Sequence, residues 1–468
     1  MPGKIVRAAM AGGNTIGAEV REPEPRADGY RHLDSPALIE RLTAAGVTTY
    51  LYGIWDSPTD WDDLRREFLP AAAAAGIEVW VYVVPPSECF PGGRCSQPYQ
   101  QDYLAWAREI AKLSRDHPCV TGWGIDDFHI GANREKFTPE YVAEMHETYR
   151  AINPDLEFWL CAYYDAAVDG AFLDTYAPFI DGIIYPYLDD PFHNTENADA
   201  VAARCAEIAA LTGPRKLGLL LLVYCGRFLG TPRDPDEEYA AACVRTGLRL
   251  SAEGRLGGVV AYGLPLAGKP APASENRALY GTGRLAFTAT RYAPVPVGSS
   301  AWASQRVGVV PDAPRHELSF WHRADWLEGT PSAGCYVKEV LLDGVVVWHE
   351  DVTENPPRQW LNGHPWQGAV DVGAQLRGKT EATLTFRLTR QREAAGFGVD
   401  VGFDRLETIG CTVTDPDFDR RGGWAFGHDH GALNAAIDLA HPDRPRRILA
   451  AVTGEFGAAA PSPPPPPP

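Results

Sequence analysis

The chain has 468 residues, 43 of them basic and 61 acidic, which gives a formal net charge of −18. Nucleic acids and anionic membrane surfaces require a basic footprint, so we expect neither as a partner. Hydrophobic residues make up 45% and charged residues 22%, a balance typical of a folded protein, and the length favours two domains.

The chain shows no strong targeting signal. No long apolar stretch follows the first basic residues, and the longest apolar run, Leu217–Val223, is too short to span a bilayer. The nine cysteines lack zinc-site spacing, although Cys89 and Cys95 could form a disulfide in an oxidising compartment. We therefore expect a cytoplasmic protein, or the mature form of a secreted one.

The first 265 residues alternate between strand-like and helix-like segments. The strand-like segments are continuously apolar, as expected of strands buried on both faces. They are Lys4–Met10, Val47–Ile54, Ile77–Val84, Val120–Asp126, Leu156–Ala162, Gly182–Tyr187, Lys216–Tyr224 and Gly257–Tyr262. Helical patterns lie between them at Pro36–Ala45, Trp61–Ala75, Gln100–His117, Pro139–Ile152, Asp169–Phe179, Thr195–Thr212 and Asp236–Glu253. This alternation predicts a (β/α)8 TIM barrel over residues 1–290.

The pattern changes after Pro265. A loop-rich connection leads to short alternating segments that predict strands at His316–Arg323, Cys335–Leu342, Val345–Glu350, Ala382–Leu388 and Phe397–Phe403. Two short helices are predicted near the end, at Ala432–Asp438 and Pro445–Val452. We expect an all-β, jelly-roll-like sandwich over residues 291–455 and a disordered proline-rich tail over residues 456–468.

Two adjacent carboxylates, Asp126 and Asp127, follow the fourth predicted strand. Functional groups of a parallel barrel gather where its strands end. Successive side chains of a strand point to opposite faces, so we expect one aspartate to act and the other to orient it or pack. Asp127, the last acid before the loop, is expected to supply the essential carboxylate.

The ends of the other strands supply further candidates. Glu88, behind Pro85 and Pro86, and Asp189, after the sixth strand, compete for the role of second carboxylate. Hydrolysis of a glycosidic bond needs two carboxyl groups, and aromatic rings and hydroxyls hold the sugar. The expected substrate-binding residues are Trp55, Asp56, Trp123, His129, Tyr164, Asp165, Tyr185, Tyr187, Tyr224 and Tyr262. These residues predict a glycosidase with a carbohydrate substrate and no cofactor.

The arrangement resembles that of TIM-barrel glycoside hydrolases with a trailing β-sandwich, and most of all the melibiase-type α-galactosidases. The resemblance implies a nucleophile at Asp126 or Asp127 and an acid/base residue at Asp189 or Asp190. The lysine of the melibiase motif is missing, because the chain reads Gly-Trp-Gly at residues 122–124. The sandwich resembles appended carbohydrate-binding domains, and its tryptophans fit either a sugar-binding surface or the core: Trp321, Trp326, Trp348, Trp360 and Trp366.

Two other functions fit the same residues. Asp126, Asp127 and His129, with Glu88 nearby, could hold a divalent metal ion for a sugar hydrolase, lyase or isomerase. A carbohydrate-binding protein whose barrel has lost catalysis is the non-enzymatic alternative. The separation of the carboxyl groups discriminates between them, because a working glycosidase pair lies ~5–10 Å apart.

Overall fold

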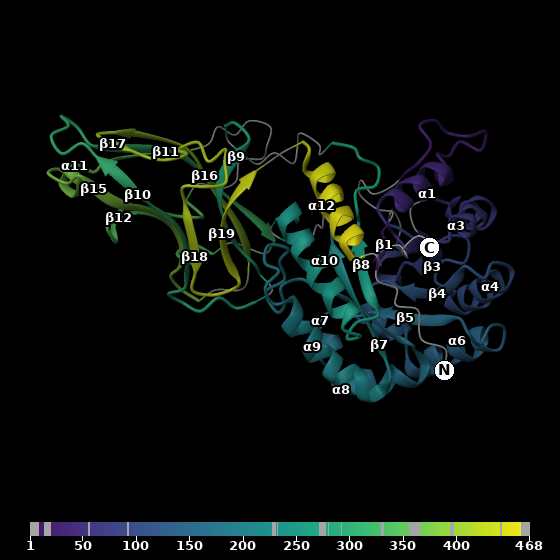
Figure 1. The fold of residues 1–468 in the computed structure, drawn as a ribbon. Helices are drawn as coiled ribbons and strands as arrows, with labels where there is room; N and C mark the ends of the chain where they lie inside the picture. The colour runs from purple at the N-terminus through teal and green to yellow at the C-terminus, as the bar shows by residue number, and fades with distance from the viewer. Residues whose placement is uncertain are drawn as a thin grey trace, which may run out of the picture.

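The computed structural model describes residues 9–13, 20–54, 57–90, 93–226, 231, 233–270, 278, 280–291, 293–328, 332–354, 366–393, 397–439 and 442–459. In this part of the chain a closed parallel barrel is followed by two antiparallel sheets, as Figure 1 shows. The predicted fold class, a TIM barrel followed by an all-β region, is therefore confirmed. No helix among these residues is long and apolar enough to cross a membrane.

Eight parallel strands form the barrel in chain order, and the last strand pairs with the first. They are β1 (Ala9–Gly12), β2 (Thr49–Ile54), β3 (Glu78–Val83), β4 (Val120–Ile125), β5 (Glu157–Cys161), β6 (Gly182–Pro186), β7 (Gly218–Tyr224) and β8 (Gly258–Tyr262). Strands β2 to β8 fall inside their predicted segments. Of the first predicted segment, residues 4–8 lie outside the described residues.

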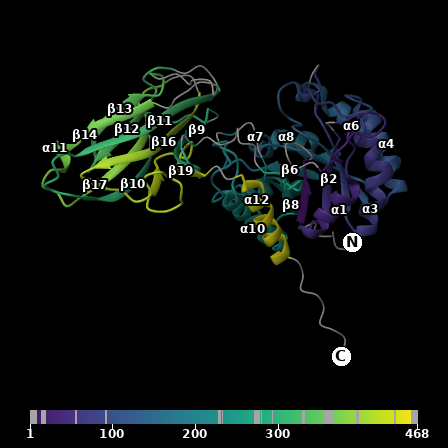
Figure 2. The ribbon, with the colours of Figure 1, turned by 90° about the horizontal axis from the view of Figure 1, so that it is seen from above.

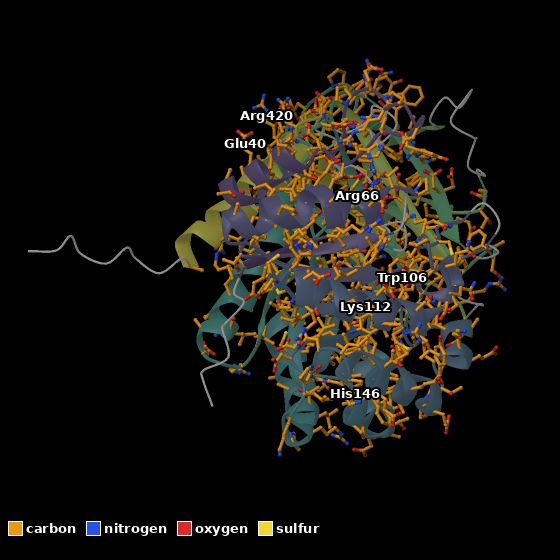
Figure 3. All side chains as sticks on the ribbon, turned by 90° about the vertical axis from the view of Figure 1, so that its right-hand side faces the viewer. Glu40, Arg66, Trp106, Lys112, His146 and Arg420 are labelled. Carbon is orange, nitrogen blue, oxygen red and sulfur yellow. A yellow bond between two sulfur atoms is a disulfide. The ribbon has the colours of Figure 1, made fainter. Side chains whose placement is uncertain are left out.

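Helices cover the outside of the barrel, and short ones lie in the loops that follow its strands. They are α1 (Ser35–Ala44), α2 (Asp60–Asp63), η1 (Leu64–Phe68), α3 (Leu69–Ala75), η2 (Pro86–Glu88), α4 (Tyr103–Asp116), α5 (Ala132–Lys136), α6 (Pro139–Arg150), α7 (Tyr164–Ala167), α8 (Gly170–Tyr176), η3 (Ala177–Phe179), α9 (Val201–Thr212), η4 (Gly213–Arg215) and α10 (Glu237–Ala252). Figure 3 looks onto this layer, where α4 is amphipathic: Trp106 is buried and Lys112 is exposed and paired with Glu109. Side chains of Asp102 and Asp236 cap α4 and α10 by accepting backbone N–H groups.

The barrel strands send alternate side chains inward and outward. Trp80 and Tyr82 of β3 belong to the cluster that fills the interior, whereas Val79 and Val81 belong to the layer under the helices. Gly122 and Gly124 of β4 make room for the two interior rings, because a Cβ at Gly122 would lie 2.7 Å from the Trp80 indole. At Gly124 a Cβ would lie 3.1 Å from the Tyr82 ring. The inward phase of β4 therefore runs through residues 122 and 124 to Asp126.

The two antiparallel sheets form a sandwich. One contains β13 (Val345–Asp351), β12 (Tyr336–Leu342), β15 (Glu381–Arg390), β10 (Ser300–Val309) and β17 (Cys411–Thr412) in that order, with β18 (Ala425–His428) also on β10. The other contains β14 (Trp366–Asp371), β11 (Glu317–Glu328), β16 (Gly398–Ile409), β9 (Gly283–Ala289) and β19 (Leu433–Leu439). The short helix α11 (Gly373–Leu376) follows β14. Ring centroids of Phe320 in β11 and Phe386 in β15 lie 5.7 Å apart, so the sheets share one core.

The prediction of a helix at Ala432–Asp438 is wrong, because β19 occupies this segment. The segment contains three alanines, which favour helix, but β19 pairs with β9 along its whole length. The second helix predicted near the end of the chain, Pro445–Val452, is confirmed, because it lies within helix α12 (Arg444–Ala459). Residues 433–439 form a strand because they pair with β9, a tertiary contact that the local sequence does not reveal.

Two elements lie on the other side of the expected domain boundaries. Strand β9 falls within residues 1–290, yet it pairs with β16 and β19 in the sandwich. Helix α12 follows the sandwich and returns to the barrel, where Ile448, Val452 and Phe456 join the core of the strand–helix layer. Figures 1 and 2 both show α12 beside α10, with the sandwich to one side of the barrel.

Of the five tryptophans singled out in the sandwich, the structure describes the side chains of Trp321 and Trp348. Trp348 is half-buried and packs edge-on against Phe320 and Phe403 of the sandwich core. Trp321 lies against Tyr280, with ring centroids 5.5 Å apart. Trp360 and the side chains of Trp326 and Trp366 lie outside the described residues.

Candidate functional site

Asp126 continues the inward phase of β4 and is held on both carboxylate oxygens. The Tyr82 hydroxyl donates to Oδ1 over 3.0 Å, and the Tyr262 hydroxyl approaches Oδ2 at 3.3 Å. These two donors come from β3 and from β8, and both rings belong to or pack against the interior cluster. Hydrogen bonds from both sides fix the orientation of the carboxylate at the carboxyl end of the barrel.

Asp127 breaks the alternation of the strand. Its backbone has φ of +43°, in the left-handed region, and its amide donates to Oδ1 of Asp126 over 3.1 Å. One carboxylate oxygen of each aspartate and the Cys161 sulfur lie within 4.8 Å of one another. The two carboxyl groups therefore do not point to opposite faces as strand alternation predicts, because the left-handed residue turns the second carboxyl back toward the first. Which of them acts and which orients stays a prediction.

The surroundings of the two carboxyl groups raise the pKa of both. Burial raises the pKa of Asp126, the charge of Glu88 raises it further, and hydrogen bonds from Tyr82 and Cys161 oppose the rise. Burial also raises the pKa of Asp127, and the charge of Asp126 adds to the effect. Like charges this close do not both ionise easily, so one proton is retained by the pair at pH values where an exposed aspartate is ionised.

Tyrosine hydroxyls surround the carboxyl pair. Tyr163 and Tyr224 share a hydrogen bond of 3.0 Å, and Tyr224 meets Tyr262 edge-on with ring centroids 5.8 Å apart. The Tyr163 hydroxyl also opposes the rise in the pKa of Asp127 by hydrogen bonding. Tyr224 and Tyr262 were predicted for the site from sequence, whereas Tyr82 was missed.

The missed residues could have been found only from the phase of the alternation. Tyr82 shares the inward phase of its strand with Trp80, and Cys161 shares that of Trp159. Once residues 122 and 124 of β4 are known to face inward, the strand pairing shows which residues of the neighbouring strands also face inward. The sequence alone carries no mark that separates these inward positions from the outward ones.

Glu88 lies close enough for its charge to raise the pKa of Asp126 and of Tyr262. It ends the short helix η2, and an Arg94 guanidinium nitrogen stands 3.8 Å from its carboxylate. The next residue, Cys89, is disulfide-bonded to Cys95, a pairing that the sequence allowed. The predicted group of Glu88, Asp126 and Asp127 is therefore brought to one end of the barrel.

Asp189 occupies a different environment. Its carboxylate accepts hydrogen bonds from the side chains of Asn194 at 3.0 Å and of Asn197 and Tyr187 at 3.3 Å. Burial raises its pKa to about 7. Asp190 accepts from the Tyr185 hydroxyl and the Leu188 amide. The described carboxylate bonds of both aspartates stay within residues 185–197, where they shape the loop after β6.

Four of the predicted sugar-binding aromatic residues lie outside the barrel interior. Trp123 stacks on Phe158 at 4.3 Å, and Tyr185 and Tyr187 are fully buried under the helices. The Tyr164 hydroxyl donates to Glu207 of α9. Trp123 and Tyr185 occupy outward strand positions, whereas Tyr164 lies in α7 and Tyr187 follows β6. None of the four joins the tyrosines around the carboxyl pair, and sugar binding by these residues stays a prediction. Trp55 and Asp56 lie outside the described residues.

His129 and Asp165 pair at the rim. The Nε2 atom of His129 lies 3.0 Å from the Asp165 carboxylate. Its Nδ1 atom is buried and has no hydrogen-bond partner among the described residues. The charge of His129 favours the ionised form of Asp127, so the imidazole belongs to the surroundings of the carboxyl pair.

Two clusters among the described residues could offer three metal ligands each. Asp126, Asp127 and Cys161 form one, and the other consists of His32, Asp63 and Glu67. In the second cluster His32 already bridges Asp63 and Asp28, at 2.6 and 2.8 Å, and Glu67 pairs with Arg26. The first cluster is the only one of the two that coincides with the predicted site. Its oxygens already accept hydrogen bonds from tyrosine hydroxyls.

A pocket of about 640 Å³ lies at the opposite end of the barrel, where β7 begins. Its lining consists of Trp159, small and aliphatic residues, Thr212 and Arg255, and includes no carboxylate. It therefore lacks the acid/base groups that the carboxyl end brings together.

No protein-family description matches the chain, and no curated protein matches it either. Among solved structures, an arabinofuranosidase matches with 14% identity and a TM-score of 0.39, covering 86% of this chain and 96% of its own. An α-L-arabinofuranosidase from Thermotoga petrophila has 12% identity and a TM-score of 0.38, covering 82% and 96%. A glucosidase from Croceicoccus marinus has 12% identity and a TM-score of 0.37, and the match covers 83% of this chain and 100% of the glucosidase. At such values the case for a function rests on the residues at the barrel mouth.

Proposed function

We propose that this chain hydrolyses a glycosidic bond at the carboxyl end of its barrel. The observation that carries the proposal is the carboxyl pair of Asp126 and Asp127, whose pKa values are both raised. Their ligand oxygens lie within 4.8 Å of each other, just short of the ~5–10 Å that separates a working glycosidase pair. A glycosidase needs one carboxyl group that is protonated and one that is ionised near neutral pH. A half-buried, mutually repelling pair supplies that state.

Asp127 is the proton donor in this proposal. Burial and the charge of Asp126 favour its protonated form, and it can pass the proton to the glycosidic oxygen as the bond to the anomeric carbon breaks. Asp126 remains ionised, because hydroxyl donors reach both of its oxygens, and it faces the positive charge that develops on the anomeric carbon. Water then adds to that carbon and returns a proton to Asp127.

The surrounding side chains suit a sugar. Tyr163 and Tyr224 offer hydroxyl groups that can exchange hydrogen bonds with sugar hydroxyls. Glu88 adds a third carboxyl group at the same end, which makes it the alternative to Asp126 for the second carboxylate role. Asp189 is not assigned that role, because its described carboxylate contacts lie within the loop after β6 and none of them joins it to Asp126 or Asp127.

The test is a screen of the purified protein against aryl glycosides and oligosaccharides, with and without a chelator. We expect release of a reducing sugar from at least one glycoside, unaffected by the chelator. Absence of turnover, together with sugar binding in calorimetry, would identify the non-catalytic alternative instead.

A metal-dependent sugar enzyme is the second candidate, because Asp126, Asp127 and Cys161 could present three ligand atoms to one ion. In that case the chelator would abolish activity, and one divalent ion would restore it. The thiol favours a softer ion such as Zn²⁺ over Mg²⁺, so restoration should be tested with both.

A further inference from the structure

We infer that Asn133 is a positioning residue that holds the loop of Glu88 and the turn of Asp127 at a fixed spacing. Asn133 lies in α5, outside the carboxyl cluster, and none of its atoms is proposed to touch substrate. The inference rests on the proposed function, because it assigns Asn133 a role in the geometry of the carboxyl groups.

The Asn133 side chain joins two separate loops. Its amide nitrogen donates to the backbone carbonyl of Asp127 over 2.7 Å and to the hydroxyl of Ser87 over 3.0 Å. Its amide oxygen accepts the backbone N–H of Ser87 at 2.7 Å. Two of these bonds go to Ser87, which directly precedes Glu88, and the third goes to Asp127 itself. Asn133 is fully buried.

The left-handed turn at Asp127 depends on this contact. The Asp127 carbonyl accepts both the Asn133 amide and the backbone N–H of Ile130, at 3.2 Å. A non-glycine residue with positive φ is retained where surrounding contacts determine its conformation. Asn133 supplies one such contact, and through Ser87 it sets how far the Glu88 loop stands from the turn.

Because Asn133 acts only through two loops, its loss should change the reaction rate by moving the carboxyl groups that those loops carry. Misplacing a catalytic group by about 1 Å can reduce the rate ~10²-fold. The charge of Glu88 contributes to the raised pKa of Asp126, so moving the Glu88 loop away should lower that pKa. The acid limb of the profile of kcat/KM against pH should then shift to lower pH.

The experiment compares Asn133→Ala and Asn133→Asp with the wild type in the full chain. Asn133→Asp keeps the volume and the acceptor for Ser87 but removes both donations, which protects the test against a misfolded alanine variant. Asn153→Ala is the matched control, because Asn153 bridges to Ser114 over 2.8 Å at the other end of the barrel. Hydrogen exchange reports on residues 85–90 and 127–133, and kinetics report on the proposed chemistry.

Both Asn133 variants should exchange faster in these two segments only and lose ~10²-fold in kcat/KM. Asn133→Ala should also show the acid limb at lower pH, whereas the new charge of Asn133→Asp opposes that shift. The control should leave the pH profile unchanged. Unaltered exchange in the two segments, or a loss of activity in Asn133→Ala without any change in its pH profile, would overturn the inference. A wild type inactive on every glycoside would overturn the proposed function, and the exchange data would still decide whether Asn133 holds the two loops together.

Discussion

At the residue scale, the strand alternation stops at Asp126, and the left-handed Asp127 places its carboxyl beside that of its neighbour. Sequence reasoning found both aspartates because they follow a buried strand. It misjudged their relative orientation, because a positive φ at a residue other than glycine leaves no clear mark in the sequence. The contact that supports the turn comes from Asn133, six residues further along the chain.

The raised pKa values predict an unusual effect of pH on stability. In the folded chain Asp126 and Asp127 hold protons more strongly than they do when unfolded, so their charged forms oppose folding. The opposition is fully present above the folded pKa values and disappears as pH falls toward the unfolded value of about 4. Asp127→Asn should therefore raise the free energy of unfolding at pH 8, by roughly 2 kcal/mol, and by much less at pH 4.5.

Denaturant unfolding at the two pH values measures this difference. The exposed Asp155 provides the control, since Asp155→Asn should change stability little at either pH. An Asp127→Asn protein that is less stable than the wild type at pH 8 would contradict the buried-charge account.

At the scale of elements, the barrel strands could be predicted because each is a continuous apolar segment. The same property concealed the inward phase, since a strand buried on both faces shows no polar alternation. For that reason Trp123, Tyr185 and Tyr187, which lie under the helices, could not be distinguished from Tyr82 and Tyr163, which belong to or pack against the interior cluster. In the sandwich, β19 was missed because its partner β9 lies about 150 residues earlier in the chain.

Helix α12 is an element of the barrel layer, although it follows the sandwich in sequence. Phe456 is 2% exposed and belongs to the strand–helix core, and Glu455 pairs with Arg245 of α10. Phe456→Ala should lower the free energy of unfolding by about 3–5 kcal/mol, because it leaves a cavity in that core. Thermal unfolding checks this, with the exposed Arg446→Ala as control. Equal melting temperatures for the two variants would show that α12 contributes little to the barrel.

At the scale of the whole molecule, a buried ionic network joins the barrel to the sandwich. Arg284 of β9 is fully buried and pairs with Asp400 at 2.8 Å and with Asp438 at 3.1 Å. From the barrel, Arg233 lies 3.5 Å from Glu196 and 3.9 Å from Asp438. The two domains are thus connected through charges that are shielded from water, in the loops that follow β6 and β7.

Breaking this network should destabilise the whole chain. Arg284→Met leaves buried carboxylates with fewer partners, and we expect a loss of about 3–5 kcal/mol in unfolding free energy. Arg405→Ala removes an exposed arginine paired with Glu407 and should cost about 0–1 kcal/mol. Denaturant unfolding of the two variants distinguishes these values, and equal effects would contradict a network that is shielded from water.

The arginines also hold the pKa of Asp438 well below its usual range. A carboxyl group with a lowered folded pKa stabilises the fold above its unfolded value, and that stabilisation is lost as pH falls toward the folded value. Wild-type stability should therefore decline below about pH 4, and the difference between wild type and Arg284→Met should become smaller there. If the stability difference between wild type and Arg284→Met stayed constant down to pH 3, ionised Asp438 would not contribute to the stability that the network provides.

The measurement that tests the central proposal most directly is kcat/KM for Asp126→Asn and Asp127→Asn on the best glycoside found in the screen. Each change removes a charge with almost no change in volume, and each folded variant should lose ~10³-fold or more, equivalent to about 4 kcal/mol at the transition state. Asp189→Asn, which alters a buried carboxyl held within the loop after β6, should remain within about tenfold of the wild type. Retention of wild-type activity by both Asp126→Asn and Asp127→Asn would contradict the assignment of the carboxyl pair.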